Sequence, residues 1–191
     1  NAHDLVAPMR HERSDLGIQG VVFSADGKCV VSWGDDKTAR IWDSGTGKLR
    51  ALLRHPSAVS GAVPSDDQRQ ALTWSIDRVV RLWNVDDAQQ PVLVLPTHEY
   101  GVEGAALTHD KARILTWDAN GTIRLWDART GALSKALADG AGLAVRGATF
   151  NADDSRILVW DERSVRIWDS RRDTASEPIV WDAGNVHSAA F

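Results

Sequence analysis

Tryptophan recurs along this 191-residue chain at a nearly fixed interval, and this recurrence is the strongest constraint on what the chain can fold into. Eight of the nine tryptophans form four pairs, whose members lie nine, nine, nine and eight residues apart. The second members of the pairs follow one another at intervals of 41, 43 and 42 residues, at Trp42, Trp83, Trp126 and Trp168. A fixed period in this range indicates a repeat architecture, in which one supersecondary unit is copied along the chain.

The residues around these tryptophans also repeat, as TARIWD, VVRLWN, TIRLWD and SVRIWD. Within a copy, apolar side chains recur with the period of two that is typical of β-strands, and turns rich in Asp and Gly separate the strands. Each copy therefore predicts four antiparallel strands and no helix. We expect an all-β chain with complete copies at approximately 11–54, 55–97, 98–140 and 141–182 and a partial copy at 183–191.

Each predicted sheet carries apolar side chains on both faces, so it needs a neighbouring sheet on either side. A Trp-Asp ending to the third strand, about 42 residues per copy, and a His near the start of most copies resemble WD40 repeats. The resemblance covers essentially the whole chain and implies a single β-propeller segment with four complete four-stranded blades and partial strands at both ends. Partial strands are expected at Leu5–Arg10 and Val186–Phe191, and they count against a closed four-bladed monomer. A fragment of a longer chain is the favoured explanation because the sequence has no initiator Met, and ring completion by several copies is the alternative.

The resemblance also implies a buried hydrogen-bonded set in each copy, because a buried indole N–H needs an acceptor. The expected sets are His11, Ser32, Asp36 and Trp42 in the first copy, and His55, Thr73, Asp77 and Trp83 in the second. In the third, Asn120 takes the place of Asp beside His98, Thr116 and Trp126. The fourth copy has Trp168, but it has Val159 in place of the hydroxyl and Glu162 at the Asp position, so we expect no intact network there.

Two further repeated positions are interpreted as scaffold. Neighbours in a strand face opposite ways, so a tryptophan directly after the hydroxyl residue is expected to enter the gap toward the adjacent blade. These residues are Trp33, Trp74, Trp117 and Trp160. An arginine two residues before each second tryptophan is expected to lay its aliphatic stem over the indole, at Arg40, Arg81, Arg124 and Arg166.

Composition argues against several functions. The formal net charge of −4 disfavours nucleic-acid binding, and no apolar run is long enough for a membrane span. The single Cys29 excludes an internal disulfide, and the six histidines show no clustered ligand spacing, so we expect no metal. We expect no cofactor and no catalytic residue, since the combination of a hydroxyl, His and Asp recurs from copy to copy, unlike a catalytic triad, which is a single constellation. A soluble, cytoplasmic protein is predicted.

Propellers usually bind partners through the rim of one face, which implies a candidate binding surface. The corresponding positions hold Gln19, Ser60, Ile76, Tyr100, Glu103, Arg146 and His187. Position-specific variation inside a constant frame is typical of recognition surfaces, and also of unconstrained solvent positions. Ile76 and Tyr100 are the strongest hot-spot candidates because desolvated apolar and aromatic groups dominate binding energy.

The predicted function is a non-catalytic scaffold or sensor module that binds other proteins or peptides. One alternative is an enzyme or small-ligand binder that uses the central channel. Another is a structural repeat protein that assembles with itself. The amino-acid sequence of the repeats resembles that of bacterial WD40 arrays attached to signalling or defence domains, which is a family-level analogy.

Overall fold

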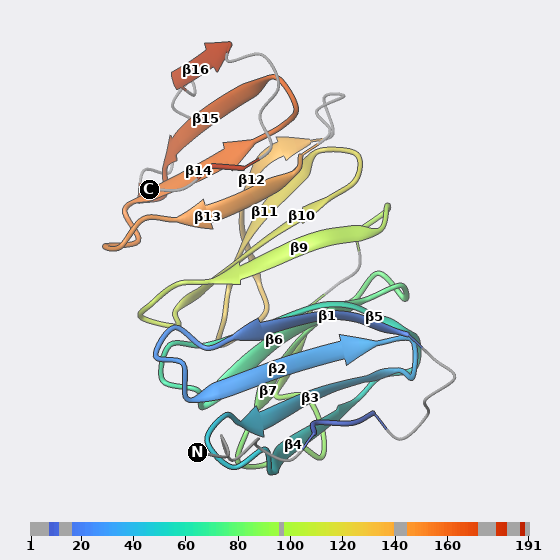
Figure 1. The fold of residues 1–191 in the computed structure, drawn as a ribbon. Helices are drawn as coiled ribbons and strands as arrows, with labels where there is room; N and C mark the ends of the chain where they lie inside the picture. The colour runs from blue at the N-terminus through green and yellow to red at the C-terminus, as the bar shows by residue number, and fades with distance from the viewer. Residues whose placement is uncertain are drawn as a thin grey trace. The chain divides into compact units, whose positions relative to one another are not determined.

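A computed structural model describes residues 8–11, 17–95, 98–139, 145–171, 179–182 and 188–189. The chain divides into two compact units, 1–94 and 95–191, and the division falls near the expected boundary between the second and third copies. Figure 1 shows the strands of each unit in chain order. The expected terminal strands fall mostly outside the described residues, and residues 8–10 are not in a strand.

The described residues form sixteen strands and no helix, which confirms the all-β prediction. In the first unit they are β1 (Ile18–Phe23), β2 (Cys29–Gly34), β3 (Thr38–Asp43), β4 (Leu49–Arg54), β5 (Val59–Pro64), β6 (Gln70–Ser75), β7 (Val80–Asn84) and β8 (Leu93–Val94). In the second unit they are β9 (Val102–Leu107), β10 (Arg113–Asp118), β11 (Thr122–Asp127), β12 (Leu133–Asp139), β13 (Gly147–Phe150), β14 (Arg156–Trp160), β15 (Ser164–Asp169) and β16 (Ile179–Asp182).

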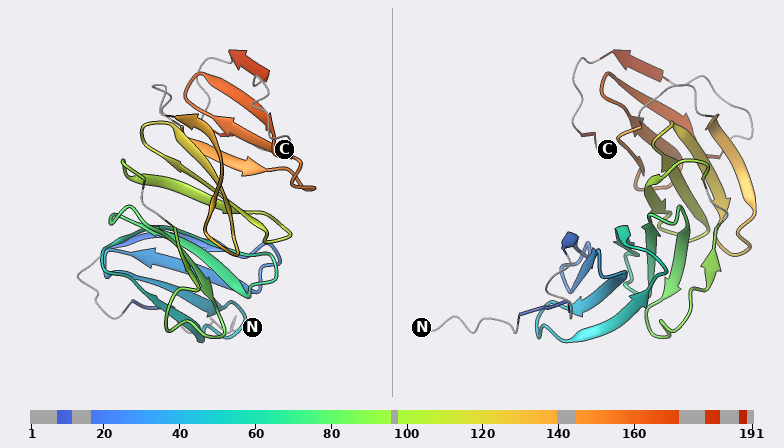
Figure 2. Two further views of the ribbon diagram at one scale, coloured as in Figure 1. Left: turned by 180° about the vertical axis from the view of Figure 1, so that it is seen from behind. Right: turned by 90° about the vertical axis from the view of Figure 1, so that its right-hand side faces the viewer.

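These strands make four antiparallel sheets of four strands, each in simple chain order (Figure 2). We number them sheet 1 (β1–β4), sheet 2 (β5–β8), sheet 3 (β9–β12) and sheet 4 (β13–β16). The order confirms the predicted meander in every copy. Short turns suffice to join antiparallel neighbours, so each copy can complete a sheet from about 42 residues of local sequence.

The turn between the first and second strand of each copy uses the same chemistry. In sheet 1, the Oδ1 atom of Asp26 accepts hydrogen bonds from the Ser24 hydroxyl at 2.8 Å and from the Lys28 amide at 3.1 Å. Gly27 adopts a positive φ of 71° in that turn. Asp67 and Asp110 accept the equivalent hydroxyl and amide bonds in sheets 2 and 3. In sheet 4, Asp153 accepts from the Asn151 side-chain amide and the Ser155 backbone amide. Asp side chains that cap the local backbone in this way explain why acidic residues punctuate the repeat.

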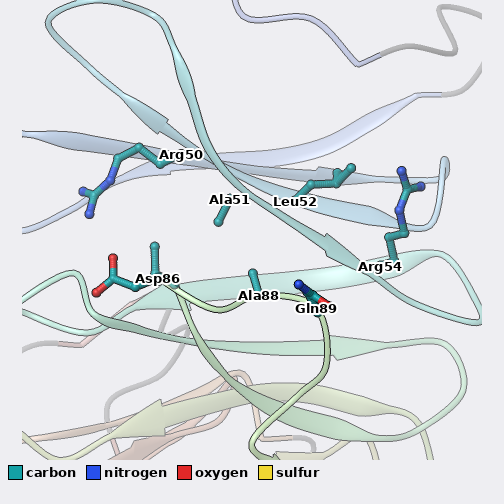
Figure 3. Close-up of a pocket in the computed structure, with 8 residues that line it drawn as sticks. Arg50, Ala51, Leu52, Arg54, Asp86, Ala88 and Gln89 are labelled. Carbon is teal, nitrogen blue, oxygen red and sulfur yellow. The ribbon is translucent and has the colours of Figure 1, made fainter.

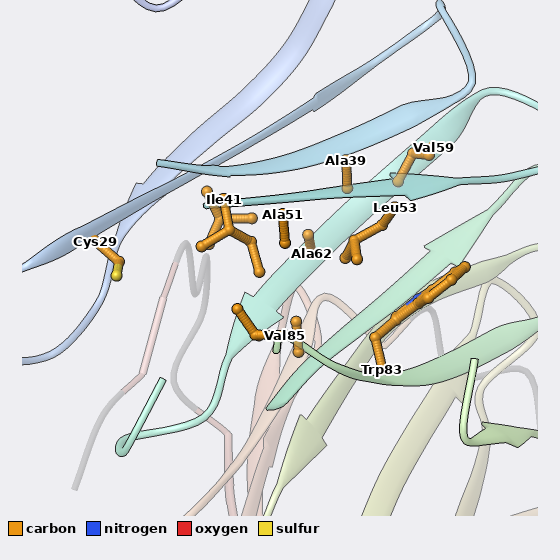
Figure 4. Packing of buried hydrophobic residues seen from close by; sticks show 11 residues of the cluster. Cys29, Ala39, Ile41, Ala51, Leu53, Val59, Ala62, Trp83 and Val85 are labelled. Carbon is orange, nitrogen blue, oxygen red and sulfur yellow. The ribbon is translucent and has the colours of Figure 1, made fainter. Parts of the chain in front are cut away.

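The core of the first unit lies between the facing surfaces of sheets 1 and 2 (Figure 4). Sheet 1 contributes Val31, Ile41 and Leu53, while sheet 2 contributes Ala62 and Trp83, which is 2% exposed. Trp33 packs against this cluster, and its indole N–H donates to the Ser60 carbonyl oxygen of β5 at 3.2 Å. Trp33 therefore enters the gap toward the following sheet, as predicted.

The second unit has a core of the same design between sheets 3 and 4. Leu115, Trp117 and Leu125 of sheet 3 pack with Phe150 and Trp168 of sheet 4. The second tryptophan of each pair is buried in all four copies, with exposed fractions of 6% or less. The indoles are thus internal packing groups, which agrees with their predicted role in the repeat.

Each second-strand tryptophan lies over a glycine of the first strand, a pairing that the sequence analysis missed. The cross-strand pairs are Gly20 with Trp33, Gly61 with Trp74, Gly104 with Trp117, and Gly147 with Trp160. A Cβ atom at any of these glycines would overlap the Cζ2 atom of the paired indole. The signal was present in the sequence, because a glycine stands thirteen residues before each of these tryptophans.

We expect Gly104→Ala to destabilise the protein by about 2 kcal/mol, since overpacking in a closed site costs roughly 1–3 kcal/mol. Gly101→Ala is the matched control, because a Cβ there would meet nothing within 4 Å. Urea unfolding at equilibrium measures both values. Equal stability of the two variants would show that the indole moves aside without strain.

Candidate functional site

The polar set of the first copy forms one connected chain of hydrogen bonds. The His11 ring places Nδ1 at 2.8 Å from Oδ2 of Asp36 and Nε2 at 2.8 Å from the Ser32 hydroxyl oxygen. The Trp42 indole N–H donates to that same hydroxyl oxygen at 2.9 Å. The chain joins residues before β1 to β2, to β3 and to the turn between those two strands.

The acidic end of this chain is held ionised. Burial alone would raise the pKa of Asp36, but hydrogen bonds from Thr38 and His11 outweigh it and bring the pKa below its ordinary value. Arg40 adds an ion pair, with Nη2 at 3.2 Å from Oδ2 of Asp36, and its Nη1 donates to the Arg10 carbonyl oxygen at 2.6 Å. A buried carboxylate with several donors is stable as the anion.

The third copy holds the same kind of chain around His98, which is 2% exposed. Its Nδ1 lies 3.0 Å from Oδ2 of Asp118 and its Nε2 lies 2.7 Å from the Thr116 hydroxyl oxygen. The Trp126 indole N–H donates to Thr116 at 2.8 Å. Burial lowers the pKa of His98, in keeping with a neutral ring that donates from Nδ1 to Asp118 and accepts the Thr116 proton at Nε2.

The prediction for Asn120 in this copy is wrong, because Asp118 supplies the carboxylate. Oδ1 of Asp118 also accepts from the backbone amides of Asn120 at 3.0 Å and Thr122 at 2.9 Å. Asp118 comes directly after Trp117, two residues earlier than the position at which the first copy carries Asp36. The tight turn lets either position direct a carboxylate to the same place, which a fixed sequence offset cannot anticipate.

The second copy departs from its predicted set. The Trp83 indole N–H donates to Thr73 at 2.7 Å, as in the other copies. Both ring nitrogens of His55, however, are buried without a hydrogen-bond partner among the described residues. The His55 ring instead packs edge-on against Trp83, with a centroid distance of 5.2 Å.

Asp77 is engaged elsewhere in that copy. Arg81 binds it through both terminal nitrogens, at 3.2 and 2.7 Å, and the Ser75 hydroxyl also donates to it. The guanidinium therefore takes the carboxylate that His55 was expected to use. Desolvation by burial is the main reason that the pKa of His55 falls to about 4, so its ring is neutral near pH 7.

In the fourth copy, Val159 offers no hydroxyl, and Trp168 is buried in the apolar core instead. Glu162 stands at the sequence position that corresponds to Asp36, but Asp161 is the acidic residue that caps the turn in this copy. Asp161 accepts from the backbone amides of Arg163 and Ser164 at 2.7 Å each and binds Arg166 at 3.0 Å. Glu162 is exposed and pairs with Arg146.

The strand arginines act through their charged ends. Arg40, Arg81 and Arg166 each ion-pair with the turn carboxylate of their own sheet. The sequence analysis predicted the packing of their aliphatic stems and did not predict a carboxylate partner. Since the pairs are largely buried, they fix the third strand to the preceding turn.

In each sheet of the first unit, a backbone hydrogen bond links the start of the first strand to the turn after the second strand. The amide of Asp35 donates to the Gly17 carbonyl oxygen at 3.0 Å, and the amide of Ile76 donates to the Ala58 carbonyl oxygen at 3.0 Å. Gln19 donates to both carboxylate oxygens of Asp35 at 3.0 Å. Ile76 is 68% exposed although it lies in a hydrogen-bonded turn.

The second unit places charged groups at the equivalent positions. Arg146 pairs with Glu162, and this hydrogen-bonded pairing is the main cause that raises the pKa of Arg146, with a further contribution from Glu103. The Ala119 amide donates to the Gly101 carbonyl oxygen at 3.2 Å, next to the exposed Tyr100. His187 lies outside the described residues.

An open groove of about 430 Å³ lies between β4 and the segment after β7 in the first unit (Figure 3). Its lining residues are Arg50, Ala51, Leu52, Arg54, Val85, Asp86, Ala88 and Gln89. The Arg50 guanidinium contacts two side chains of the same unit: its Nη1 atom lies 3.0 Å from Oε1 of Gln68 and 2.7 Å from Sγ of Cys29. Sequence reasoning did not find this groove, because residues distant in the chain form it.

The His11, Ser32 and Asp36 contacts have the connectivity of a catalytic triad, but Ser32 is 6% exposed and its oxygen already accepts from Trp42. A nucleophile must reach its substrate, so we interpret this hydrogen-bonded set of His11, Ser32 and Asp36 as structural. The described residues contain no group of three or more His, Cys, Asp or Glu side chains able to hold a metal ion. That same part of the chain contains no helix long and apolar enough to cross a bilayer.

These features define a repeat protein of stacked antiparallel sheets with a buried Trp, hydroxyl, His and Asp chain in its best-preserved copies. The family model described as WD domain, G-beta repeat (WD40) matches residues 8–43 and 89–127, which supports a WD40 family. A comparison with curated proteins gives no match. WD40 repeats generally mediate protein–protein interaction, and their propellers are typically non-catalytic.

We expect Thr116→Val to destabilise the protein more than Thr73→Val. Thr116 serves both Trp126 and His98, whereas Thr73 serves Trp83, and each buried polar group left without a partner costs about 1–3 kcal/mol. The expected losses are about 3 kcal/mol and about 1.5 kcal/mol. Denaturant unfolding measures them, with Thr149→Val as a half-buried strand control outside the networks. Similar losses for Thr116 and Thr73 would contradict the shared-hydroxyl interpretation.

Acidification should destabilise the fold through His55. Its folded pKa of about 4 lies below the ordinary 6.5, so the unfolded chain binds the extra proton first as the pH falls. Stability is lost as the pH falls from about 6.5 toward 4, and the His55 contribution at pH 5 is about 2 kcal/mol. Unfolding curves at pH 7 and 5 measure it. His55→Phe keeps a ring beside Trp83 and should lose less stability over this interval; an unchanged pH dependence would refute the assignment.

Proposed function

We propose that this chain is a non-catalytic protein-interaction module whose contact surface is the rim of its sheets. The observation that carries the proposal is the contrast between neighbouring positions of the first strand. Gly20, Gly61, Gly104 and Gly147 are constant because an indole lies over each of them. The residue directly before each glycine is Gln19, Ser60, Glu103 or Arg146, and it differs in charge and size from copy to copy. A constant frame that presents variable side chains suits recognition.

In the first unit, Ile76 is the proposed anchor. It is a large apolar side chain, and the bond between its amide and the Ala58 carbonyl oxygen fixes its backbone. An exposed apolar group on a fixed backbone loses little conformational entropy when a partner covers it. Ser60 and the Gln19–Asp35 pair supply the polar groups of this rim.

In the second unit, Tyr100 is the proposed anchor, and Glu103, Arg146 and Glu162 supply charge. Tyrosine contributes a large rigid surface and a polar tip, the properties that make it frequent at interfaces. Two carboxylates accompany one guanidinium here, which favours a partner segment that carries a cation. In this proposal each unit has a rim surface of its own.

The same proposal extends to the setting of the module. We propose that the four sheets are blades of a β-propeller, and that the protein works in the cytoplasm, where a free buried thiol such as Cys29 is normal. The resemblance of the repeat sequences to bacterial multidomain WD40 arrays supports a sensing or scaffolding role beside a separate effector domain.

Peptides selected from a displayed random library on the purified chain provide the test. Ile76→Asp in the first unit, or Tyr100→Ala with Arg146→Ala in the second, should weaken the selected peptides at least tenfold in fluorescence anisotropy. A tenfold change corresponds to about 1.4 kcal/mol, well within what one hot-spot residue contributes.

Val92→Asp is the matched control for Ile76→Asp, because Val92 is also exposed, at 57%, and lies outside the rim. Peptides that bind both rim variants as tightly as the unaltered chain would exclude the rim as the contact surface. Loss of binding in Val92→Asp alone would move the surface to the outer strands.

A further inference from the structure

The groove between β4 and the segment after β7 has the edge of a β-sheet as one of its walls. β4 is the last strand in the order β1-β2-β3-β4, so no strand among the described residues pairs with its outer edge. The opposite wall is formed by segment 85–89, which follows β7 of sheet 2. Both walls belong to the first unit. The groove therefore combines an unpaired strand edge with a second wall from the neighbouring sheet.

The register of β4 determines which of its backbone groups face outward. The His55 amide donates to the Lys37 carbonyl oxygen of the preceding turn at 2.9 Å, and Leu53 continues this pairing with β3. In an antiparallel pair every second residue exchanges hydrogen bonds with the partner strand, and the residues between them point their N–H and C=O groups away from it. Leu52 and Arg54 are such residues. Their backbone groups lie two residues apart on the open edge, which is the spacing that a further strand requires.

The neighbouring edge of sheet 2 offers much less backbone. Its outer strand, β8, has two residues, whereas β4 has six. Segment 85–89 leaves sheet 2 before β8 begins, and Ala88 packs against the core cluster of sheets 1 and 2. This departure brings the segment beside β4, so the longer edge of the first unit is also the one that borders the groove.

The charges in the groove are distributed unevenly along β4 (Figure 3). Arg50 and Asp86 lie at one end, and the Arg50 guanidinium already contacts Gln68 and Cys29. Arg54 lies at the other end. It is exposed, and no described carboxylate forms an ion pair with it. The uncompensated charge of the groove is therefore positive and belongs to Arg54.

We propose that the outer edge of β4 binds an extended peptide segment of a partner protein, which adds a strand to sheet 1 and places an acidic side chain opposite Arg54. A polypeptide backbone is favoured because its donors and acceptors match the outward-facing groups of Leu52 and Arg54. Ala51 and Ala88 lie between the two ends, and their small side chains leave the middle of the groove open (Figure 3). An acidic residue is favoured because it would give the unpaired guanidinium a charge-assisted hydrogen bond. None of these residues belongs to the rim.

Fluorescence anisotropy with defined peptides tests the charge preference on the intact chain. The probes are blocked heptapeptides of alternating Thr and Val that carry Glu, Gln or Lys at the central position. The Glu peptide should bind about fivefold more tightly than the Gln peptide, and the Lys peptide should bind most weakly. Arg54→Glu should reverse this order. Arg129→Glu, the same change at an exposed arginine of the second unit, should leave the order as it is in the unaltered chain.

Methylation of the peptide backbone separates strand addition from a purely electrostatic contact. A strand on an edge bonds through every second amide, and the central Glu opposite Arg54 fixes which amides these are. Methylation of the even-numbered amides and of the odd-numbered amides should therefore differ, with one pattern abolishing binding and the other preserving it. Loss or retention of binding with both patterns would overturn strand addition.

A change in β4 itself examines the same hydrogen bonds from the protein side. Leu52→Pro removes an outward-facing N–H without breaking a bond to β3, so it should abolish the binding of all three peptides. Leu52→Ala, which keeps the N–H, should retain the binding of the Glu peptide. Circular dichroism verifies that each variant folds, and the methylated peptides give the answer on the unaltered chain if Leu52→Pro does not.

Three further outcomes would contradict the proposal: no binding of any peptide, equal affinity for the Glu and Gln peptides, and tighter binding after Arg54→Ala. The last would mean that the arginine protects the edge from pairing with other strands. The rim variant Ile76→Asp should bind the Glu peptide as tightly as the unaltered chain does, which separates this surface from the rim.

Discussion

A four-stranded sheet with apolar side chains on both faces is stable only when both faces are covered, and every other feature of this chain follows from that constraint. Burial of the tryptophan, leucine, isoleucine and valine side chains between facing sheets supplies the main driving force. The paired tryptophans serve opposite faces: Trp83 packs toward the preceding sheet, and Trp33 toward the following one. The glycine beneath each second-strand indole lets that large ring lie flat over the first strand.

Most polar groups in these cores belong to partnered sets, and the membership of the sets varies more than the packing does. The first and third copies use a His, hydroxyl and carboxylate chain to satisfy the tryptophan donor. The second copy replaces the His contact to Asp77 with Arg81, leaving His55 neutral and dependent on Trp83 for its packing. The fourth removes the hydroxyl altogether through Val159. Packing tolerates these changes because the apolar contacts are distributed over many side chains, whereas each polar set depends on two or three atoms.

The functional argument rests on the same division between frame and variable positions. Positions that contact a neighbouring sheet are constrained by volume, so they repeat. Positions just before and at the start of the first strand, and in the turn after the second strand, reach solvent, and they hold amide, hydroxyl, acidic, basic, apolar and aromatic groups in different copies. This arrangement suits a protein that presents a surface to a partner, which is the general role of WD40 repeats. The buried His, Ser and Asp groups, by contrast, are committed to the frame.

The sequence alone determined the period, the four-stranded meander and the interior position of the tryptophans, because a repeated alternation of side chains leaves a sheet few ways to bury them. The resemblance of its repeats also identified Ser32, Thr73 and Thr116 as the hydroxyl partners of the buried indoles. Only the tertiary structure decided which carboxylate serves each network, since Asp118 and Asp161 reach the turn from a different offset than Asp36. It likewise decided the lack of hydrogen-bond partners for the His55 ring and the pairing of Arg146 with Glu162. These depend on distances between side chains and on what covers a face, and neither is encoded in a local pattern of residues.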